Sequence, residues 1–250
     1  MTQRPKQNEG NAAEIFKRQV GVSGIGEDGQ SRLVNAKVLV IGGGGLGSPV
    51  ITYLASAGVG TIFVADGDAV ELSNLNRQFL HGIDDVGQSK ADSAVASARR
   101  INGQSTLVAI ESYLSGSSLD EAVRRVDCVV DCVDSDVVRV AVGRACLKAG
   151  IPLVEAGVHD LYGWVLCIDR AHACLECAGL RTDVVSDAKP PVLGALVGII
   201  GAMQALECIK ILTGSPDVEY GALVNFDGVE METEKIILER SDACVAHGFA

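Results

Sequence analysis

The chain has 250 residues, of which 48% are hydrophobic and 21% charged, a composition that is typical of globular proteins and excludes a disordered or fibrous chain. This length suits one large domain or a domain with a modest appendage. The net charge of −11 disfavours nucleic acid as a partner, because its phosphates would be repelled.

Residues 1–30 are polar and glycine-dotted, with a short helical pattern around AEIFKRQV. No apolar run follows the first ten residues, so we expect no signal peptide. The most apolar segment, residues 192–212, has polar or charged side chains in its second half, and its uncharged part is shorter than the roughly 20 residues that span a bilayer. We therefore expect a buried helix there, no membrane partner and a cytoplasmic protein.

From Lys37 onward, short β-branched runs alternate with helical patterns, as expected for a parallel sheet covered by helices. The expected strands are 37–41, 61–66, 105–110, 127–131 and 151–156, and the expected helices lie near 47–58, 88–103, 117–125 and 136–149. Three later runs, 163–169, 220–226 and 234–240, are typical of additional, antiparallel strands. The predicted fold is a Rossmann-like, doubly wound α/β domain whose mostly parallel sheet is extended by antiparallel strands.

A glycine-rich turn, VLVIGGGGLGS, joins the first expected strand to a helix. Gly42, Gly44 and Gly47 have the G-x-G-x-x-G spacing, which permits a tight turn and a close approach of backbone to phosphate at a helix N-terminus. Asp66 ends the next strand about 20 residues later, where an acidic side chain binds ribose hydroxyls. The sequence therefore predicts a nucleotide site.

The residues after Asp66 favour ATP over a nicotinamide cofactor. Asn74, Arg77 and Lys90 follow closely, and two fixed cations suit a triphosphate from which pyrophosphate departs. Each cation alone would be read as a surface charge. An oxidoreductase remains an alternative, but the sequence shows no substrate domain of the kind that such an enzyme needs.

Three aspartates, Asp131, Asp134 and Asp136, lie at the end of the fourth expected strand and just after it. Ligands bind at the carboxyl ends of strands in such sheets, and a carboxylate there could hold Mg²⁺ on phosphate oxygens. One of the three could instead cap the following helix. We find no compelling Ser-His-Asp or Cys-His set.

The chain resembles the MoeB/ThiF/HesA family, the prokaryotic relatives of ubiquitin-activating enzymes. The resemblance extends from FKRQVGVSGIGEDGQ to CVAH, and its most specific segment is YLASAGVGTIFVADGDAVELSNLNRQFLH. Within the family, the molybdopterin-synthase and thiamin-pathway adenylyltransferases are the most similar. The resemblance implies a single ThiF-type domain over 1–250, with a helical arm (1–30), a nucleotide-binding core (36–156) and a portion for carrier and zinc binding (157–250).

The family resemblance implies an ATP-dependent adenylyltransferase. The C-terminal Gly-Gly carboxylate of a small ubiquitin-like sulfur carrier protein would attack the α-phosphate of ATP, releasing pyrophosphate and leaving an acyl-adenylate. The implied nucleotide-binding residues are Gly42, Gly44, Gly45, Gly47, Asp66, Asn74, Arg77 and Lys90. Asp134 would hold Mg²⁺, and Arg18 would reach the active site of the other subunit of a homodimer. Together with Arg77 and Lys90, these two residues form the implied catalytic set.

Two positions depart from the family pattern. Ser135 stands where the family usually has Asn. The stretch GLRTDVVSDAKPPVLGAL, in the place of the family's crossover loop, has no cysteine for a thioester or persulfide. We therefore expect the chemistry of this chain to stop at the adenylate, with a separate sulfur donor.

Eight cysteines in a chain of this size, without a secretion signal, favour reduced thiols. Most lie in apolar runs, but Cys174 and Cys177 form a C-x₂-C pair, and Cys244 and His247 follow near the C-terminus. Cys₃His is an accepted Zn²⁺ ligand set, and the family usually has four cysteines there. We expect a structural zinc knuckle, with His172 as a competing fourth ligand and an empty site as the alternative.

Other functions remain open at this stage. Relatives that adenylate a ribosomal peptide or another small substrate offer one alternative. A nucleotide-binding scaffold without catalysis is another.

Overall fold

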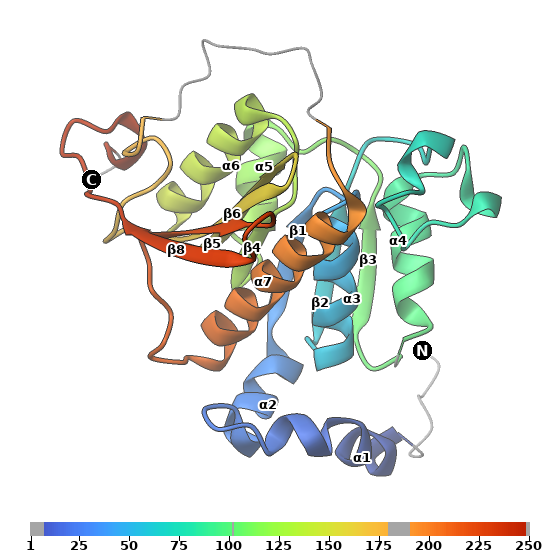
Figure 1. Cartoon of the computed structure of the whole chain (residues 1–250). Coiled ribbons are helices and arrows are strands. Elements are labelled where there is room, and N and C mark those ends of the chain that lie inside the picture. The colour runs from blue at the N-terminus through green and yellow to red at the C-terminus, as the bar shows by residue number, and fades with distance from the viewer. Residues whose placement is uncertain (1–7, 102, 180–190, 249–250) are drawn as a thin grey trace.

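The computed structural model describes residues 8–101, 103–179 and 191–248 (Figure 1). Within them, an eight-stranded sheet has the order β3-β2-β1-β4-β5-β6-β7-β8. The first five strands in the chain pair in parallel, and β6, β7 and β8 are added antiparallel at the β5 edge. This arrangement confirms the predicted mostly parallel sheet with an antiparallel extension.

The strands are β1 (Lys37–Ile41), β2 (Thr61–Ala65), β3 (Thr106–Ile110), β4 (Cys128–Asp131), β5 (Leu153–His159), β6 (Tyr162–Ile168), β7 (Ala222–Asp227) and β8 (Glu232–Ile237). The helices are α1 (Asn8–Val20), α2 (Gly26–Asn35), α3 (Gly47–Ala57), α4 (Lys90–Arg99), α5 (Gly116–Val123), α6 (Asp136–Ala149) and α7 (Gly194–Thr213). Short 3₁₀ turns lie at η1 (Leu72–Asn74), η2 (Ile83–Asp85) and η3 (Val245–His247).

Helices cover both faces of the sheet. Helices α3, α4 and α7 pack on one face around Val38, Leu54 and Ile200, while α5 and α6 pack on the other around Leu39 and Val142. The parallel strands β1 and β4 are buried on both faces, which explains their uninterrupted apolar sequences. These two hydrophobic layers account for most of the driving force for folding.

The strand order reverses between β1 and β4. The chain leaves β1 toward β2 and β3 on one side, and later returns to β4 and β5 on the other. In sheets of this kind, ligands bind in the crevice outside the carboxyl ends of the strands at this reversal. The glycine turn after β1 and the aspartates after β4 both lie at that edge.

Two helices differ from what the sequence suggests. Helix α2 lies in a polar, glycine-dotted stretch, and its buried Leu33 joins the main core. Helix α7 buries one face through residues such as Ile200 and Gln204, but exposes Ile199 and Leu206 on the other. By length and composition, α7 is a candidate membrane span among the described residues, yet its inner face packs on the sheet as a core helix does.

Candidate nucleotide site and metal centre

The turn between β1 and α3 requires its glycines. Gly42 has φ +101°, and a methyl group there would lie 2.7 Å from the carbonyl oxygen of Cys132. A methyl group at Gly47 would lie 2.1 Å from the carbonyl oxygen of Gly42. The first turn of α3 therefore closes tightly on the loop, and its N-cap, Leu46, provides no capping side chain. Backbone N–H groups at such a helix start can bind phosphate.

Asp66 is fixed beside this loop. One carboxylate oxygen accepts a hydrogen bond from the backbone N–H of Gly43 at 2.8 Å, and the other accepts one from the backbone N–H of Asp68 at 2.8 Å. The side chain thus lies where β2 ends and next to the glycine turn. This is the position from which an acidic group contacts ribose in doubly wound folds.

Lys90 and Arg77 flank the same turn. Lys90 is buried at the start of α4, and its ammonium nitrogen lies 2.8 Å from a carboxylate oxygen of Asp68. The side-chain carbons of Arg77 lie beside Gly45, and its guanidinium donates to the carbonyl oxygen of Ser73 at 3.1 Å. The side chain of Arg77 and the backbone of Lys90, whose carbonyl oxygen adjoins Gly43, therefore both border the glycine turn, and both residues come from the segment that follows β2.

Asn74 is buried within this segment and supports its local shape. Its side-chain oxygen accepts a hydrogen bond from the backbone N–H of Glu71 at 3.2 Å, which closes the 3₁₀ turn η1. Its amide nitrogen lies 3.4 Å from the hydroxyl of Ser73. The phosphate contact that the family resemblance implies for Asn74 stays a prediction.

The three aspartates at the end of β4 and just after it have different surroundings. Asp131 is fully buried 3.7 Å from the guanidinium of Arg139, and burial raises the pKa of its carboxyl despite this cation. Asp134 is exposed at the crevice, three residues further on. The N-cap of α6 is Ser135, with no capping bond from its side chain. Asp136, the first residue of α6, is also exposed and lies 3.7 Å from the guanidinium of Arg139, so both Asp134 and Asp136 face solvent at this edge of the sheet.

Val133 precedes Asp134, and buried side chains form hydrogen bonds with both its backbone N–H and its carbonyl oxygen. The N–H of Val133 donates to Asp131 at 3.0 Å, and Arg139 donates to the carbonyl oxygen of Val133 at 2.8 Å. Arg139 also donates to the carbonyl oxygen of Ala156 at 2.6 Å. The loop that carries Asp134 is thus tied to β5.

Arg18 lies far from the glycine turn of its own chain. It is exposed on α1, and the neighbouring Phe16 packs against Gly58, which caps the C-terminal end of α3. The glycine turn adjoins the N-terminal end of α3. The 11 residues of this helix therefore separate the turn from Gly58, which Phe16 contacts, by about 16 Å. Figure 1 shows α1 at the edge of the molecule remote from that turn.

The sequence did not indicate a functional role for His81. The structure buries it between the glycine turn and α4, where its Nδ1 lies 2.8 Å from the hydroxyl of Ser93 and its Nε2 lies 3.0 Å from the carbonyl oxygen of Gly43. Burial lowers the pKa of the imidazole. A neutral ring therefore supports the backbone of the glycine turn.

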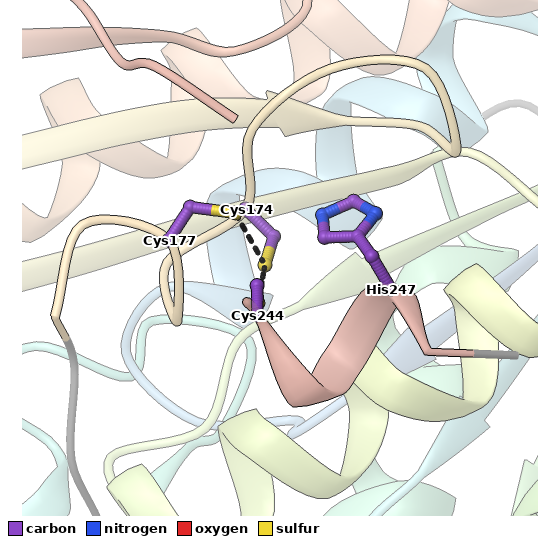
Figure 2. Close-up of side chains that lie close together, drawn as sticks. All are labelled: Cys174, Cys177, Cys244 and His247. Carbon is purple, nitrogen blue, oxygen red and sulfur yellow. Dashed lines mark hydrogen bonds between the residues drawn. The ribbon is translucent and has the colours of Figure 1, made fainter. Parts of the chain in front are cut away.

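The four expected zinc ligands come together (Figure 2). Cys174 and Cys177 lie on the loop after β6, and Cys244 and His247 lie at η3. All four ligand atoms lie within 4.8 Å of one another, and the sulfur of Cys174 lies 3.8 Å from those of Cys177 and Cys244. Two sulfurs at about 2.3 Å from a tetrahedral Zn²⁺ would be separated by about 3.8 Å.

His247 also fits a metal-bound role. Its Nε2 is buried with no hydrogen-bond partner among the described residues, as expected of a ligand atom that awaits an ion. The competing residue, His172, is engaged elsewhere: its Nδ1 lies 2.8 Å from Asp169, and its ring stacks on Tyr220. The donor set suits Zn²⁺, with His247 rather than His172 as the fourth member.

The remaining cysteines fill the core. Cys128, Cys132, Cys146, Cys167 and Cys208 are all buried free thiols. Burial raises the pKa of Cys146 and Cys167, so these thiols are protonated and unreactive. Most of the stretch expected to be the crossover loop, residues 180–190, lies outside the described residues.

A glycine turn, an adjoining carboxylate and two cations at the reversal of a parallel sheet define a nucleotide-binding protein of the doubly wound α/β class. The ThiF family model matches residues 16–246, and the chain belongs to this family.

Relatives with known names are similar over nearly the whole chain. The chain is 35% identical over 243 residues to the sulfur carrier protein ThiS adenylyltransferase of Escherichia coli, covering 93% of this chain and 94% of that protein. It is 33% identical over 237 residues to the molybdopterin-synthase adenylyltransferase of the same organism, covering 93% and 95%. It is 40% identical over 230 residues to the adenylyltransferase and sulfurtransferase MOCS3 of Mus musculus, covering 90% of this chain and 50% of that protein.

Solved structures share the fold. The E. coli MccB structure with MccA-N7isoASN has a TM-score of 0.83 at 22% identity, covering 98% of this chain and 77% of that chain. The structure of PaaA has a TM-score of 0.77 at 23% identity, covering 96% and 77%. These similarities confirm the arrangement of the sheet and its helices.

Proposed function

We propose that the protein is an ATP-dependent adenylyltransferase that activates the C-terminal glycine carboxylate of a ubiquitin-like sulfur carrier protein. The observation that carries the proposal is the placement of Asp66, Arg77 and Lys90 around one glycine turn. That arrangement provides one anchor for a ribose and two cations for a polyphosphate. Two relatives at 35% and 33% identity, each aligned over 93% of this chain, are named sulfur carrier protein ThiS adenylyltransferase and molybdopterin-synthase adenylyltransferase.

The reaction needs positioning and charge neutralisation, with no protein nucleophile. A carboxylate oxygen of the carrier attacks the α-phosphorus, the bond from that phosphorus to the bridging oxygen breaks, and pyrophosphate leaves. The glycine turn and the start of α3 bind phosphate oxygens, while Asp66 holds the ribose. Arg77 and Lys90 neutralise the charge that develops on the departing pyrophosphate, and the amide of Asn74 contacts the phosphates as a hydrogen-bond donor.

Mg²⁺ would bind at Asp134, an exposed carboxylate just after β4 to which the family resemblance assigns the ion. Its chemistry there is to neutralise phosphate oxygens and align them. Hydrogen bonds that join Asp131 and Arg139 to the backbone of the preceding residue fix the position of the chain at Asp134. The next residue is Ser135, which stands where the family usually has Asn, so this chain lacks that amide side chain.

We further propose a homodimer in which Arg18 acts on the partner's site. Arg18 is about the length of α3 away from its own glycine turn, so it serves catalysis only across an interface. Exposed apolar side chains on two helices that pack together support such an interface: Ile199 and Leu206, seven residues apart on α7, are 37% and 57% exposed, and Tyr53 on α3 is 51% exposed. Exposed apolar side chains that gather into a patch mark association surfaces.

Zinc would be structural in this protein. Cys174, Cys177, Cys244 and His247 leave no coordination position for substrate, and the ion would tie the C-terminal turn to the loop after β6. We propose the cytoplasm as the location, because eight cysteines without a disulfide are typical of a reducing compartment. The sulfur itself comes from a separate donor.

The direct test is mass spectrometry of a candidate Gly-Gly carrier after incubation with the protein, ATP and Mg²⁺. The proposal expects an adenylate on the carrier C-terminus, lost when the last glycine is removed. Adenylation of a short peptide but of no carrier would instead favour the peptide-modifying alternative. Nucleotide binding without any adenylated product would favour a scaffold.

A further inference from the structure

A tyrosine and an aspartate at the mouth of the nucleotide site hold Lys90. One carboxylate oxygen of Asp68 lies 2.8 Å from the Lys90 ammonium nitrogen, and the other accepts a hydrogen bond from the Tyr113 hydroxyl. Tyr113 follows β3, Asp68 follows β2 and Lys90 begins α4. Three segments that converge on the carboxyl edge of the sheet are therefore joined through one carboxylate.

The contact is built into the fold. The Tyr113 ring lies on the backbone of Gly67, where a methyl group would come within 2.7 Å of the ring carbons. The backbone N–H of Asp68 donates to Asp66, which in turn accepts from Gly43. Asp68 is thus held from its backbone by the proposed ribose-binding residue and from its side chain by Tyr113 and Lys90.

The carboxylate of Asp68 and the phosphates of a bound nucleotide would compete for the single ammonium group of Lys90. Its side chain is only 10% exposed, so without a nucleotide it needs an anion, and Asp68 provides one. A triphosphate on the glycine turn would require the same ammonium. The Asp68 side chain is 47% exposed, so water and the Tyr113 hydroxyl can solvate its carboxylate once Lys90 turns away.

We propose that Asp68 is a built-in competitor for Lys90 that lowers nucleotide affinity, and that Tyr113 reduces the cost of its release by continuing to donate to the freed carboxylate. The inference rests on the proposed nucleotide site. Neither residue needs to touch the nucleotide, so both are positioning residues.

The experiment is calorimetric titration of the full chain with a non-hydrolysable ATP analogue and Mg²⁺, without carrier. Asp68→Asn removes the competing charge but keeps an acceptor for Tyr113, and we expect it to tighten binding by about threefold to tenfold. Tyr113→Phe should weaken binding by about twofold to fivefold. In the Asp68→Asn background, Tyr113→Phe should change nothing, because its effect acts through the carboxylate.

A matched control separates competition from general charge removal. Glu111 is an exposed acid two residues before Tyr113, and Glu111→Gln should change affinity by less than about twofold. Equal tightening by this control would mean that any lost negative charge suffices, and would overturn the proposal. Weaker binding by Asp68→Asn would make Asp68 a residue that orients Lys90 productively. A Tyr113→Phe effect that persists in the double variant would place the phenol on the nucleotide.

A spectroscopic readout checks the hydrogen bond itself. The hydrogen bond to Asp68 raises the pKa of Tyr113 to about 12. The tyrosinate absorbance of Tyr113 is the part of the signal that Tyr113→Phe lacks. We expect this absorbance to develop near pH 12 in the wild type and at lower pH in Asp68→Asn. If the wild type binds no nucleotide, the proposed function and this inference both fail. If it binds and these variants do not shift affinity, only the inference fails.

Discussion

The Nε2 atom of His81 lies 3.0 Å from the carbonyl oxygen of Gly43, so a buried imidazole supports the turn on which the phosphates of a nucleotide would lie. Because a carbonyl oxygen only accepts, Nε2 carries the hydrogen, and Nδ1 accepts from the hydroxyl of Ser93 at 2.8 Å. Burial lowers the pKa of this imidazole, which favours the neutral ring with this tautomer in the folded protein.

Stability should depend on pH through His81. Its pKa is lowered on folding, mainly by burial, so below its ordinary value near 6.5 the unfolded chain binds more protons than the folded one. The free energy of unfolding then falls as pH drops from about 6.5 to the folded-state pKa. Urea denaturation of the wild type and His81→Gln from pH 5 to 8 measures this, and the other histidines cancel in the difference. Parallel curves for the two proteins would contradict the prediction.

Substitution of a glycine by alanine should affect stability differently inside and outside the glycine turn. Gly47→Ala places a methyl group 2.1 Å from the Gly42 carbonyl oxygen, which should destabilise the protein by about 1–3 kcal/mol and weaken nucleotide binding. Gly198→Ala, within α7, meets nothing within 4 Å and should be neutral or stabilising by about 0.5–1 kcal/mol. Thermal unfolding and calorimetric titration report both quantities. Equal effects would show that the tight loop does not constrain Gly47.

Action of Arg18 across a dimer predicts complementation between inactive proteins. Arg18→Ala and Asp134→Ala should each lose adenylation, the latter by about 10²–10³-fold. In a mixed dimer, one site regains an intact Asp134 together with the intact Arg18 of its partner. Random co-expression should therefore restore about a quarter of the wild-type activity, because half the dimers are mixed and half their sites are complete. No restoration in verified mixed dimers would place the action of Arg18 within its own chain.

The Cys₃His cluster predicts one zinc ion per chain and a loss of stability on its removal. His247→Ala should lower the metal content measured by elemental analysis and lower the melting temperature, whereas His172→Ala should leave the metal content unchanged. Because tightly bound ligands stabilise by mass action, chelation should cost the wild type about 3–4 kcal/mol. A wild type that is metal-free as purified and does not respond to added Zn²⁺ would mean an empty site.

The sequence predicted the parts of the fold that depend on local hydrophobic patterns. The strands β1 to β5 carry continuous apolar runs, of which β1, β4 and most of β5 are buried on both faces, and α3 follows a glycine spacing with a known geometric purpose. Helix α2 was missed because its polar, glycine-containing sequence has low helix propensity, and packing of Leu33 into the core compensates.

The site was predicted less completely, because its supporting contacts join residues distant in the chain. His81 is 38 residues from Gly43, and Tyr113 is 45 from Asp68, so no local pattern connects them. The aspartates after β4 are equivalent in sequence. Only the buried Arg139 beside Asp131 separates that residue from the exposed Asp134.

The most direct test of the central claim is ATP–pyrophosphate exchange, measured with and without a carrier that ends in Gly-Gly. Adenylation of a carrier predicts exchange that requires both the carrier and Mg²⁺, that is lost when the carrier's last glycine is removed, and that falls sharply in Asp134→Ala. Exchange that proceeds equally well without any carrier, or no exchange with several carriers by a protein that still binds ATP, would contradict it.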